Sequence, residues 1–359
     1  MKEKKGLGEI GRREERREGR ERRRIVMMMM VVMMVMGCNS GGRDPEKVFL
    51  SEMVNLGKGF LDVFVSFGDM ITGTLGIKAE TKKEDIGKYF SDIEKTMNSV
   101  KEKLQEEVSK NGQYEKVKTV VEQFISGTVD KIAAGAKEAA LGASGSGVIG
   151  NAEAGKDAAP AETGSVNKLV KGIKAIVEVV LRSDEGDAGA TKTNVEQQKT
   201  IGELFEKKDN ASESAAAAAN ATVGAVSGAD ILKAIAKSKE DPKADSTNGI
   251  EKATDAAGIA IAPSVANKKE IKEDTAKKDA IIAAGIALRG MAKDGKFAAK
   301  SNEEKSANAV NGAVASAVNK VLSTLIIAIR NSVDEGLKGI NKVLGEIKQG
   351  EGSVAKINE

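Results

Sequence analysis

The sequence predicts an all-α protein folded as an elongated helical bundle. Apolar residues recur three or four positions apart through most of residues 48–348, the spacing that lines one face of an α-helix. Alternating apolar and polar runs are nearly absent, as are hairpin signals. The segments between the periodic stretches are rich in Gly, Ala and Ser, which end helices without building strands.

Two long helices are predicted at the start of the folded region. One apolar stripe covers residues 49–71, and a second covers residues 86–108. The second stripe follows a capping-box pattern at residues 81–84 and stops at Asn111-Gly112. We expect the two helices to belong to a stem.

A third helix is predicted over residues 117–132. Eight of the ten aromatic residues lie between Phe49 and Phe124. We therefore expect the N-terminal third to hold most of the large core side chains and to be the most rigid part of the chain.

The middle of the chain is rich in alanine and glycine. Residues 142–165 and 183–194 show no regular apolar spacing and are predicted to be flexible loops. They flank a helix predicted at residues 166–180. Alanine-rich helices alternate with breaks over residues 215–293. Since alanine supplies helix propensity but little apolar area, we expect these helices to be less firmly packed.

A long helix is predicted at the C-terminal end. Residues 301–304 form a capping pattern, and apolar positions then recur from Val310 to Ile347. We expect this helix to pair with the N-terminal helices as a membrane-proximal stem. The Ala/Gly-rich loops and short helices would then be distal and exposed.

The composition excludes several kinds of chemistry. The chain of 359 residues has no His, no Trp and one Cys. Without His there is no Ser-His-Asp or Cys-His nucleophile pair and no His-ligated zinc. One Cys excludes an internal disulfide and any multi-cysteine metal site. Carboxylates are plentiful, but each fits a solvated helix face. We expect no enzyme, and no catalytic, metal-binding or cofactor-binding residue.

Residues 1–37 have the form of an export signal. Residues 1–24 hold 11 Lys/Arg and 6 Asp/Glu, and the uncharged run Ile25–Met36 follows. This run is shorter than the roughly 20 apolar residues of a membrane-spanning helix. We therefore expect export followed by cleavage.

Cys38 is the predicted lipidation site. Val35-Met36-Gly37-Cys38 resembles a bacterial lipobox, in which the cysteine becomes an acylated N-terminus. Each buried CH₂ contributes about 0.8 kcal/mol, so one acyl chain binds a membrane marginally and several bind it stably. Residues 38–47 would be a lipidated tether to a membrane. The alternative is a lone cysteine without a role.

The charge of the mature chain disfavours nucleic acid as a partner. Removal of the first 37 residues changes the net charge from +3 to −2. The remaining basic pairs, such as Lys82-Lys83 and Lys277-Lys278, are interleaved with Glu and Asp and lack neighbouring aromatics. A weak contact with host glycosaminoglycan is a minor alternative.

Six blocks of the sequence have a distinctive composition: Gly37–Gly42, Pro45–Met70, Thr74–Met97, Lys116–Ala140, Ile286–Ala298 and Val318–Leu344. These blocks resemble the variable large proteins, also called variable major proteins, of relapsing-fever Borrelia. The resemblance covers most of the mature chain and is loosest in the middle.

The resemblance implies an outer-surface lipoprotein whose serial replacement by other variants evades host antibodies. It implies that Cys38 is the acylated residue, and it brings no catalytic residues. On this interpretation residues 48–359 are the helical surface-antigen domain. The rivals are an adhesin that binds a host glycosaminoglycan or serum protein, and a periplasm-facing lipoprotein with a housekeeping role.

Two phosphate-loop patterns are weak. Residues 145–150 satisfy G-x-G-x-x-G, and residues 150–157 miss a P-loop only at Asp157. Both motifs need a preceding strand and a following helix. A predicted helix precedes them and Pro160 follows, so nucleotide binding is disfavoured.

Overall fold

The computed structural model describes residues 45–70 and 76–348. Cys38, the export signal and the tether up to residue 44 lie outside the described residues. The chain divides into two units, residues 1–51 and 52–359, and the second forms the helical bundle. Helix α2 begins at Pro45, inside the segment 38–47 that the sequence predicts to be a tether.

The all-α prediction is confirmed: the described residues contain helices and isolated β-bridges but no strand. The α-helices are α2 (Pro45–Met70), α3 (Lys83–Lys110), α4 (Glu115–Phe124), α5 (Asp130–Gly142), α6 (Thr163–Val180), α7 (Val195–Thr200), α8 (Glu213–Ala225), α9 (Gly228–Ala236), α10 (Ala256–Ile261), α11 (Asp279–Met291) and α12 (Glu304–Gly345). A π-helical turn, Ile125–Val129, joins α4 to α5. Short 3₁₀ helices cover Ile201–Phe205, Lys208–Asn210 and Gly249–Lys252.

We call residues 52–70 of α2, together with α3, α4, α5 and the second half of α12, the stem. Glu52 of α2 lies near the end of α3, because the Tyr114 hydroxyl, just beyond α3, donates to the Glu52 carboxylate at 3.2 Å. At its other end, α3 begins with Lys83, which contacts the residues that follow α11. The 28 residues of α3 therefore separate these two ends by about 42 Å.

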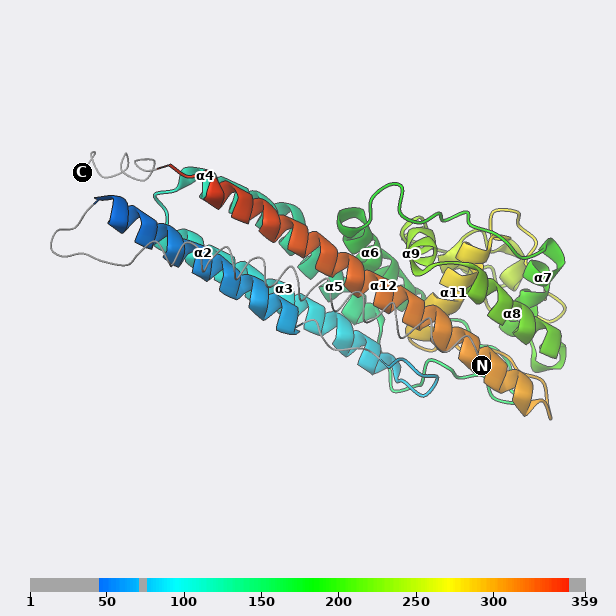
Figure 1. Ribbon diagram of the computed structural model, residues 1–359. Helices are drawn as coiled ribbons and strands as arrows, with labels where there is room; N and C mark the ends of the chain where they lie inside the picture. Colours follow the sequence, from blue (N-terminus) through cyan, green and yellow to red (C-terminus); the bar gives the residue numbers. More distant parts are fainter. Residues whose placement is uncertain (1–44, 71–75, 349–359) are drawn as a thin grey trace, which may run out of the picture. The chain divides into compact units, whose positions relative to one another are not determined.

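We call α6 to α11 and their loops the head. Helices α8, α9 and α11 pack along the first half of α12, and α4 packs along the second half (Figure 1). Gly336 of α12 receives the Phe124 ring where a Cβ would overlap it. Helix α12 is long and apolar enough to cross a membrane, but half of its most apolar window is buried, as in a core helix.

The prediction that the alanine-rich helices are less firmly packed is wrong for α11. Twelve of its thirteen residues are buried. Gly285 leaves no room for a Cβ against Ile259, and Gly290 leaves none against Val314. Small side chains let the helix backbones approach closely, so that packing contacts replace the area that large side chains would bury.

Helices α5 and α6 approach each other through glycines. A Cβ on Gly172 would lie 2.4 Å from the backbone nitrogen of Ala139 and from the backbone oxygen of Gly135. A Cβ on Gly142 would lie 2.6 Å from the backbone oxygen of Ser165. Any side chain at these positions would push the two helices apart.

The predicted helix starts differ in detail from the observed ones. Helix α3 begins one residue after Lys82, whose backbone amide donates to the Asp85 carboxylate at 3.3 Å, so the cap is not made by Thr81 and Glu84. Helix α12 begins at Glu304, and Asn302 adopts a left-handed conformation instead of capping it. The helices were predictable, but these capping roles were not.

Four helices of the head end on a cation supplied from elsewhere in the chain. None of the four ends in glycine. Carbonyls at the ends of α8, α10 and α11, and those of Leu181 and Arg182 just beyond α6, accept hydrogen bonds from a side-chain N–H. Positive charge is favoured at a helix C-terminus, because the helix dipole places partial negative charge there. We call these side chains the helix-end cations: Lys233 for α6, Lys320 for α8, Arg289 for α10 and Lys83 for α11.

The segment 143–162 is a loop that carries many backbone contacts. The Lys83 amide donates to the Gly147 carbonyl at 2.9 Å, and isolated bridges pair Lys156 with Ala299 and Ala159 with Lys296. The predicted flexibility of residues 142–165 and 183–194 stays a prediction.

Candidate functional site: the loops of the head

The head presents three loops between buried helices. They are residues 181–194 between α6 and α7, residues 237–248 after α9, and residues 262–278 between α10 and α11. We call them the head loops. Most of their residues are exposed or half-buried, whereas helices α6, α9, α10 and α11 beside them contribute residues to the core. The loops therefore form a surface whose side chains are largely free of packing.

One buried carboxylate holds the far end of loop 181–194. Asp279, the first residue of α11, is fully buried. Its Oδ2 accepts the backbone amides of Lys192 at 2.6 Å and Thr193 at 2.8 Å. Its Oδ1 accepts the Thr193 hydroxyl at 2.5 Å, the Gln198 amide at 3.1 Å and the Thr222 hydroxyl at 3.2 Å. A single side chain thus joins the loop to α7, α8 and α11.

The environment of Asp279 keeps it ionised. Burial alone would raise the pKa of this carboxyl, but the hydrogen bonds from Lys192, Thr193 and Gln198 outweigh burial and lower the pKa below its usual value. A carboxylate that accepts several N–H and O–H donors is stabilised in its charged form. Asp279 therefore acts as a fixed acceptor.

The near end of the same loop is fixed by backbone contacts. Lys233 donates from Nζ to the Arg182 carbonyl at 2.8 Å. Gly186 has φ +80°, and a Cβ there would lie 2.5 Å from the backbone of Ala229. The Asp187 amide donates to the Asp230 carboxylate at 2.7 Å. Both ends of the loop are therefore tied down by contacts that leave most of its side chains outside.

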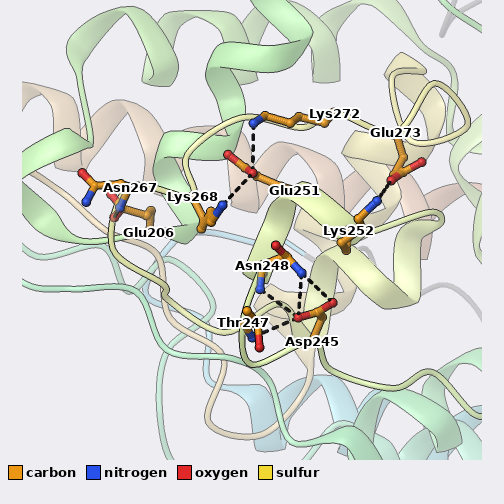
Figure 2. A network of polar contacts seen from close by, with 10 residues as sticks. All are labelled: Glu206, Asp245, Thr247, Asn248, Glu251, Lys252, Asn267, Lys268, Lys272 and Glu273. Atoms are coloured by element: carbon orange, nitrogen blue, oxygen red, sulfur yellow. Dashed lines mark hydrogen bonds and ion pairs between the residues drawn. The ribbon is translucent and has the colours of Figure 1, made fainter.

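Loop 262–278 is fastened to the 3₁₀ helix Gly249–Lys252 by ion pairs (Figure 2). Glu251, only 9 % exposed, lies between Lys268 at 3.5 Å and Lys272 at 3.0 Å. Lys252 pairs with Glu273 at 2.8 Å. Because Glu251 is mostly shielded from water, its pairs are screened less than ordinary surface pairs.

Two further carboxylates shape the turns in this region. Asp245 Oδ1 accepts the backbone amides of Thr247 at 2.9 Å and Asn248 at 2.8 Å, which closes a tight turn (Figure 2). Buried Glu206 accepts the Asn267 amide at 2.8 Å, where Asn267 has a left-handed φ of 64°. Both turns are set by a side chain that accepts backbone N–H groups.

Sequence reasoning did not find these anchors, because it assigned every carboxylate to a solvated helix face. That assignment is wrong for Asp279 and Glu206, which are fully buried. For Asp279 a signal existed: residues 280–288 are apolar or small on every side, and a helix that is apolar all round is buried all round. A charged residue at the start of such a helix must find partners.

The residues of the two disfavoured phosphate-loop patterns make structural contacts. Asp157 binds the Lys208 amide at 3.0 Å and Lys207 Nζ at 3.2 Å, and the glycines at 145 and 147 lie in the loop that meets α3. Among the described residues no group of three His, Cys, Asp or Glu side chains could hold a metal ion. Cys38 lies outside the described part.

The fold and the loops define a helical scaffold that presents anchored surface loops. Comparison with known proteins identifies the family to which this scaffold belongs. The Borrelia lipoprotein family matches residues 60–344. Variable large protein 4 of Borrelia hermsii is 63% identical over 330 residues, which cover 90% of this chain and 93% of that protein. Variable large protein 17 of the same organism is 60% identical over 332 residues, which cover 90% of this chain and 92% of that protein.

The fold has been solved in a related protein. The crystal structure of the Lyme disease variable surface antigen VlsE of Borrelia burgdorferi superposes with a TM-score of 0.71 at 34% identity, over 82% of this chain and 98% of that one. The chain belongs to the variable large protein family of Borrelia lipoproteins.

Proposed function

We propose that this chain is a lipid-anchored antigen of the bacterial outer surface, exchanged for other variants under antibody pressure. The single observation that carries the proposal is the way the head loops are held. Asp279, Asp245 and Lys233 hold the first two head loops largely through backbone groups, which every residue type except proline supplies. Loop 262–278 is held instead by ion pairs of its own side chains. Exposed side chains of the first two loops can therefore change while the loop path is kept.

The energetics fit such exchange. Substitutions at exposed sites usually change stability by less than about 0.5 kcal/mol. The interactions that hold the fold lie in buried helices such as α11 and α12. Related proteins that are only 28% to 40% identical still align with more than four fifths of this chain. Wide sequence change on one fold is what serial antigen replacement requires.

The anchor proposal extends the stem. Residues 1–37 are the export signal, Cys38 carries the acyl chains in the outer membrane, and a short tether leads to α2. The bundle begins at the stem end where Glu52 meets Tyr114, about 42 Å along α3 from the junction at Lys83. A chain attached there would present the head loops to the outside and to host antibodies. We propose no catalytic role.

Protease shaving of live cells, combined with metabolic labelling by radioactive palmitate, tests the proposal. The wild-type chain should be labelled, bound to cells and removed by external protease. A Cys38→Ala chain should lose the label and keep its uncut leader. If the Cys38→Ala chain stays on the cell exterior, the anchor assignment is wrong. If the wild-type chain survives external protease, it faces the periplasm instead.

A further inference from the structure

Three asparagines of this chain are each followed by glycine: Asn111-Gly112, Asn248-Gly249 and Asn311-Gly312. Asparagine is one of the chemically labile residues of proteins. Its decay begins when the backbone nitrogen of the next residue attacks the carbon of the side-chain amide. Glycine hinders that attack least, because it has no Cβ and its backbone is the most permissive. The three pairs have the same sequence, so their surroundings decide which of them reacts.

Asn311 and Gly312 are fixed within α12. The Asn311 Oδ1 accepts the Ala152 backbone amide at 2.8 Å, and its Nδ2 donates to the Ala152 carbonyl at 3.0 Å. Gly312 lies inside the same helix, where each backbone N–H donates to the carbonyl four residues back. Both the carbon that would be attacked and the nitrogen that would attack it are therefore held by hydrogen bonds.

Asn248 and Gly249 are fixed in the tight turn at Asp245 (Figure 2). The Asn248 Nδ2 donates to Asp245 Oδ2 at 3.2 Å, and the Asn248 backbone amide donates to Oδ1 at 2.8 Å. The Gly249 amide donates to the Asp245 carbonyl at 2.9 Å. Gly249 is also buried, with a φ of +54°. The attacking nitrogen is again occupied by a hydrogen bond.

Asn111 and Gly112 are held much less. Asn111 directly follows the last residue of α3, and Gly112 is exposed. The Asn111 Nδ2 donates to the Glu107 carbonyl at 2.9 Å. Among the described residues, no acceptor is recorded for the Gly112 amide. Helix ends fray and open at a low free-energy cost, so this nitrogen is free to reach the side chain.

We propose that Asn111 is a site of spontaneous deamidation through a cyclic imide formed with Gly112. The Gly112 nitrogen loses its proton and bonds to the Asn111 Cγ. The Cγ–Nδ2 bond breaks, and Nδ2 leaves as ammonia with that proton. Water then opens the imide. Attack of water on the side-chain carbonyl gives aspartate, and attack on the backbone carbonyl gives isoaspartate, in which the chain continues through the side chain.

Either product weakens the end of α3. A carboxylate cannot donate to the Glu107 carbonyl as the Asn111 Nδ2 does. Its negative charge also lies at a helix C-terminus, where the helix dipole already places partial negative charge. The Asn111 carbonyl accepts the Tyr114 amide at 3.1 Å, and the Tyr114 hydroxyl contacts Glu52 of α2. The reaction therefore alters the turn that joins α3 to this contact of the stem.

Peptide mapping by mass spectrometry tests the proposal. The full chain is incubated at mildly alkaline pH and digested, and the mass increase caused by exchange of NH₂ for OH is followed at each Asn-Gly pair. The same incubation in urea is the control, because unfolding frees all three pairs. We expect Asn111 to react at least about tenfold faster than Asn248 and Asn311 in the folded chain, since a protected site must first open. In urea the three rates should be similar.

Two matched variants test the route. Gly112→Ala should slow the reaction at Asn111, because a Cβ hinders the attacking nitrogen. The fold should tolerate it, since a Cβ at Gly112 would lie 3.8 Å from the Val108 carbonyl oxygen. Gly312→Ala, where a Cβ would meet nothing within 4 Å, should leave the reaction at Asn111 unchanged. Thermal unfolding checks that both variants keep the fold.

The product mixture identifies the intermediate. A cyclic imide gives both aspartate and isoaspartate, and methylation by an isoaspartyl methyltransferase detects the second. Aspartate alone, or an unchanged rate in Gly112→Ala, would overturn the imide route. Equal rates at the three pairs in the folded chain, or an Asn111 that stays intact while Asn248 or Asn311 reacts, would overturn the assignment of the site.

Discussion

Replacing Asp279 should loosen the first head loop and destabilise the whole head. Asp279→Ala removes the acceptor for five donors. The buried Gln198 amide keeps its bonds to the Thr191 hydroxyl at 2.6 Å and the Thr193 carbonyl at 3.3 Å. The buried Thr222 hydroxyl keeps only a long contact of 3.5 Å with the Thr193 hydroxyl. A buried donor left without a partner costs about 1–3 kcal/mol. The amides of Lys192 and Thr193 can turn to water and add little. The free energy of unfolding should therefore fall by about 1–3 kcal/mol, mainly because of the Thr222 hydroxyl.

Urea unfolding followed by far-UV circular dichroism measures this change, since the chain has no Trp. Hydrogen exchange gives the local result: the amides of Lys192 and Thr193 should lose protection in Asp279→Ala. Asp279→Asn keeps the volume and one acceptor, but its NH₂ group faces donors. It should cost about half as much as Asp279→Ala.

The pH dependence provides a second readout. The pKa of Asp279 is lowered in the folded chain, so the unfolded chain binds the proton more readily. Its stabilising contribution is present above the unfolded pKa and is lost as pH falls through the folded pKa. The stability gap between wild type and Asp279→Asn should therefore narrow in acid.

The matched control is Asp184→Asn in the same loop. Asp184 is exposed and, within the described part of the chain, pairs with the exposed Arg182, so its replacement should change stability by less than about 0.5 kcal/mol. An Asp279→Ala protein that is as stable as Asp184→Asn, with Lys192 and Thr193 still protected, would refute the role assigned to this carboxylate.

Two further predictions concern the junction and the α5–α6 contact. Burial and the nearby Arg289 lower the pKa of Lys83 to about 7. The unfolded chain therefore binds more protons than the folded chain, and the free energy of unfolding should rise by about 1 kcal/mol from pH 7 to pH 8. Lys83→Met should abolish that rise in urea titrations, and an unchanged rise would exclude Lys83 as its source. Gly172→Ala should lower the free energy of unfolding by about 1–3 kcal/mol, because the added Cβ overpacks against Ala139. Gly164→Ala in the same helix, where a Cβ would meet nothing within 4 Å, should be neutral or stabilising. Equal melting temperatures for the two variants would contradict the close approach of α5 and α6.

The helices were predictable because their apolar spacing repeats over many turns. The stripes at residues 86–108 and 310–347 correspond to α3 and α12, and the stop at Asn111-Gly112 falls at the end of α3. A helix prediction from apolar periodicity rests on many residues, so a few positions that break the pattern do not change it. The boundaries were less predictable, since Thr81 and Ser301 satisfied a local capping pattern that the chain does not use. The Thr81 hydroxyl accepts the Lys78 amide in the preceding turn, Lys82 and Asp85 form the cap of α3, and Asn302 is left-handed before α12.

The packing of the alanine-rich head could not be predicted from side-chain size. Alanine and glycine in α11 bury little area each, yet the helix is enclosed because its neighbours approach to backbone contact. Such contacts depend on which helices meet, and that information is spread over distant parts of the chain. The same holds for Asp279, whose partners lie 57 to 87 residues away.

The helix-end cations affect which segments of the gene can be replaced. Each reaches the peptide oxygens of a helix that lies far along the chain: Lys83 acts 206 to 212 residues away and Lys320 acts 94 to 97 residues away. Every residue type has a peptide oxygen, so these hydrogen bonds do not depend on which amino acids stand at the helix C-termini. A gene encoding such a protein could replace whole stretches around those points and still yield a chain whose helices end where they did before.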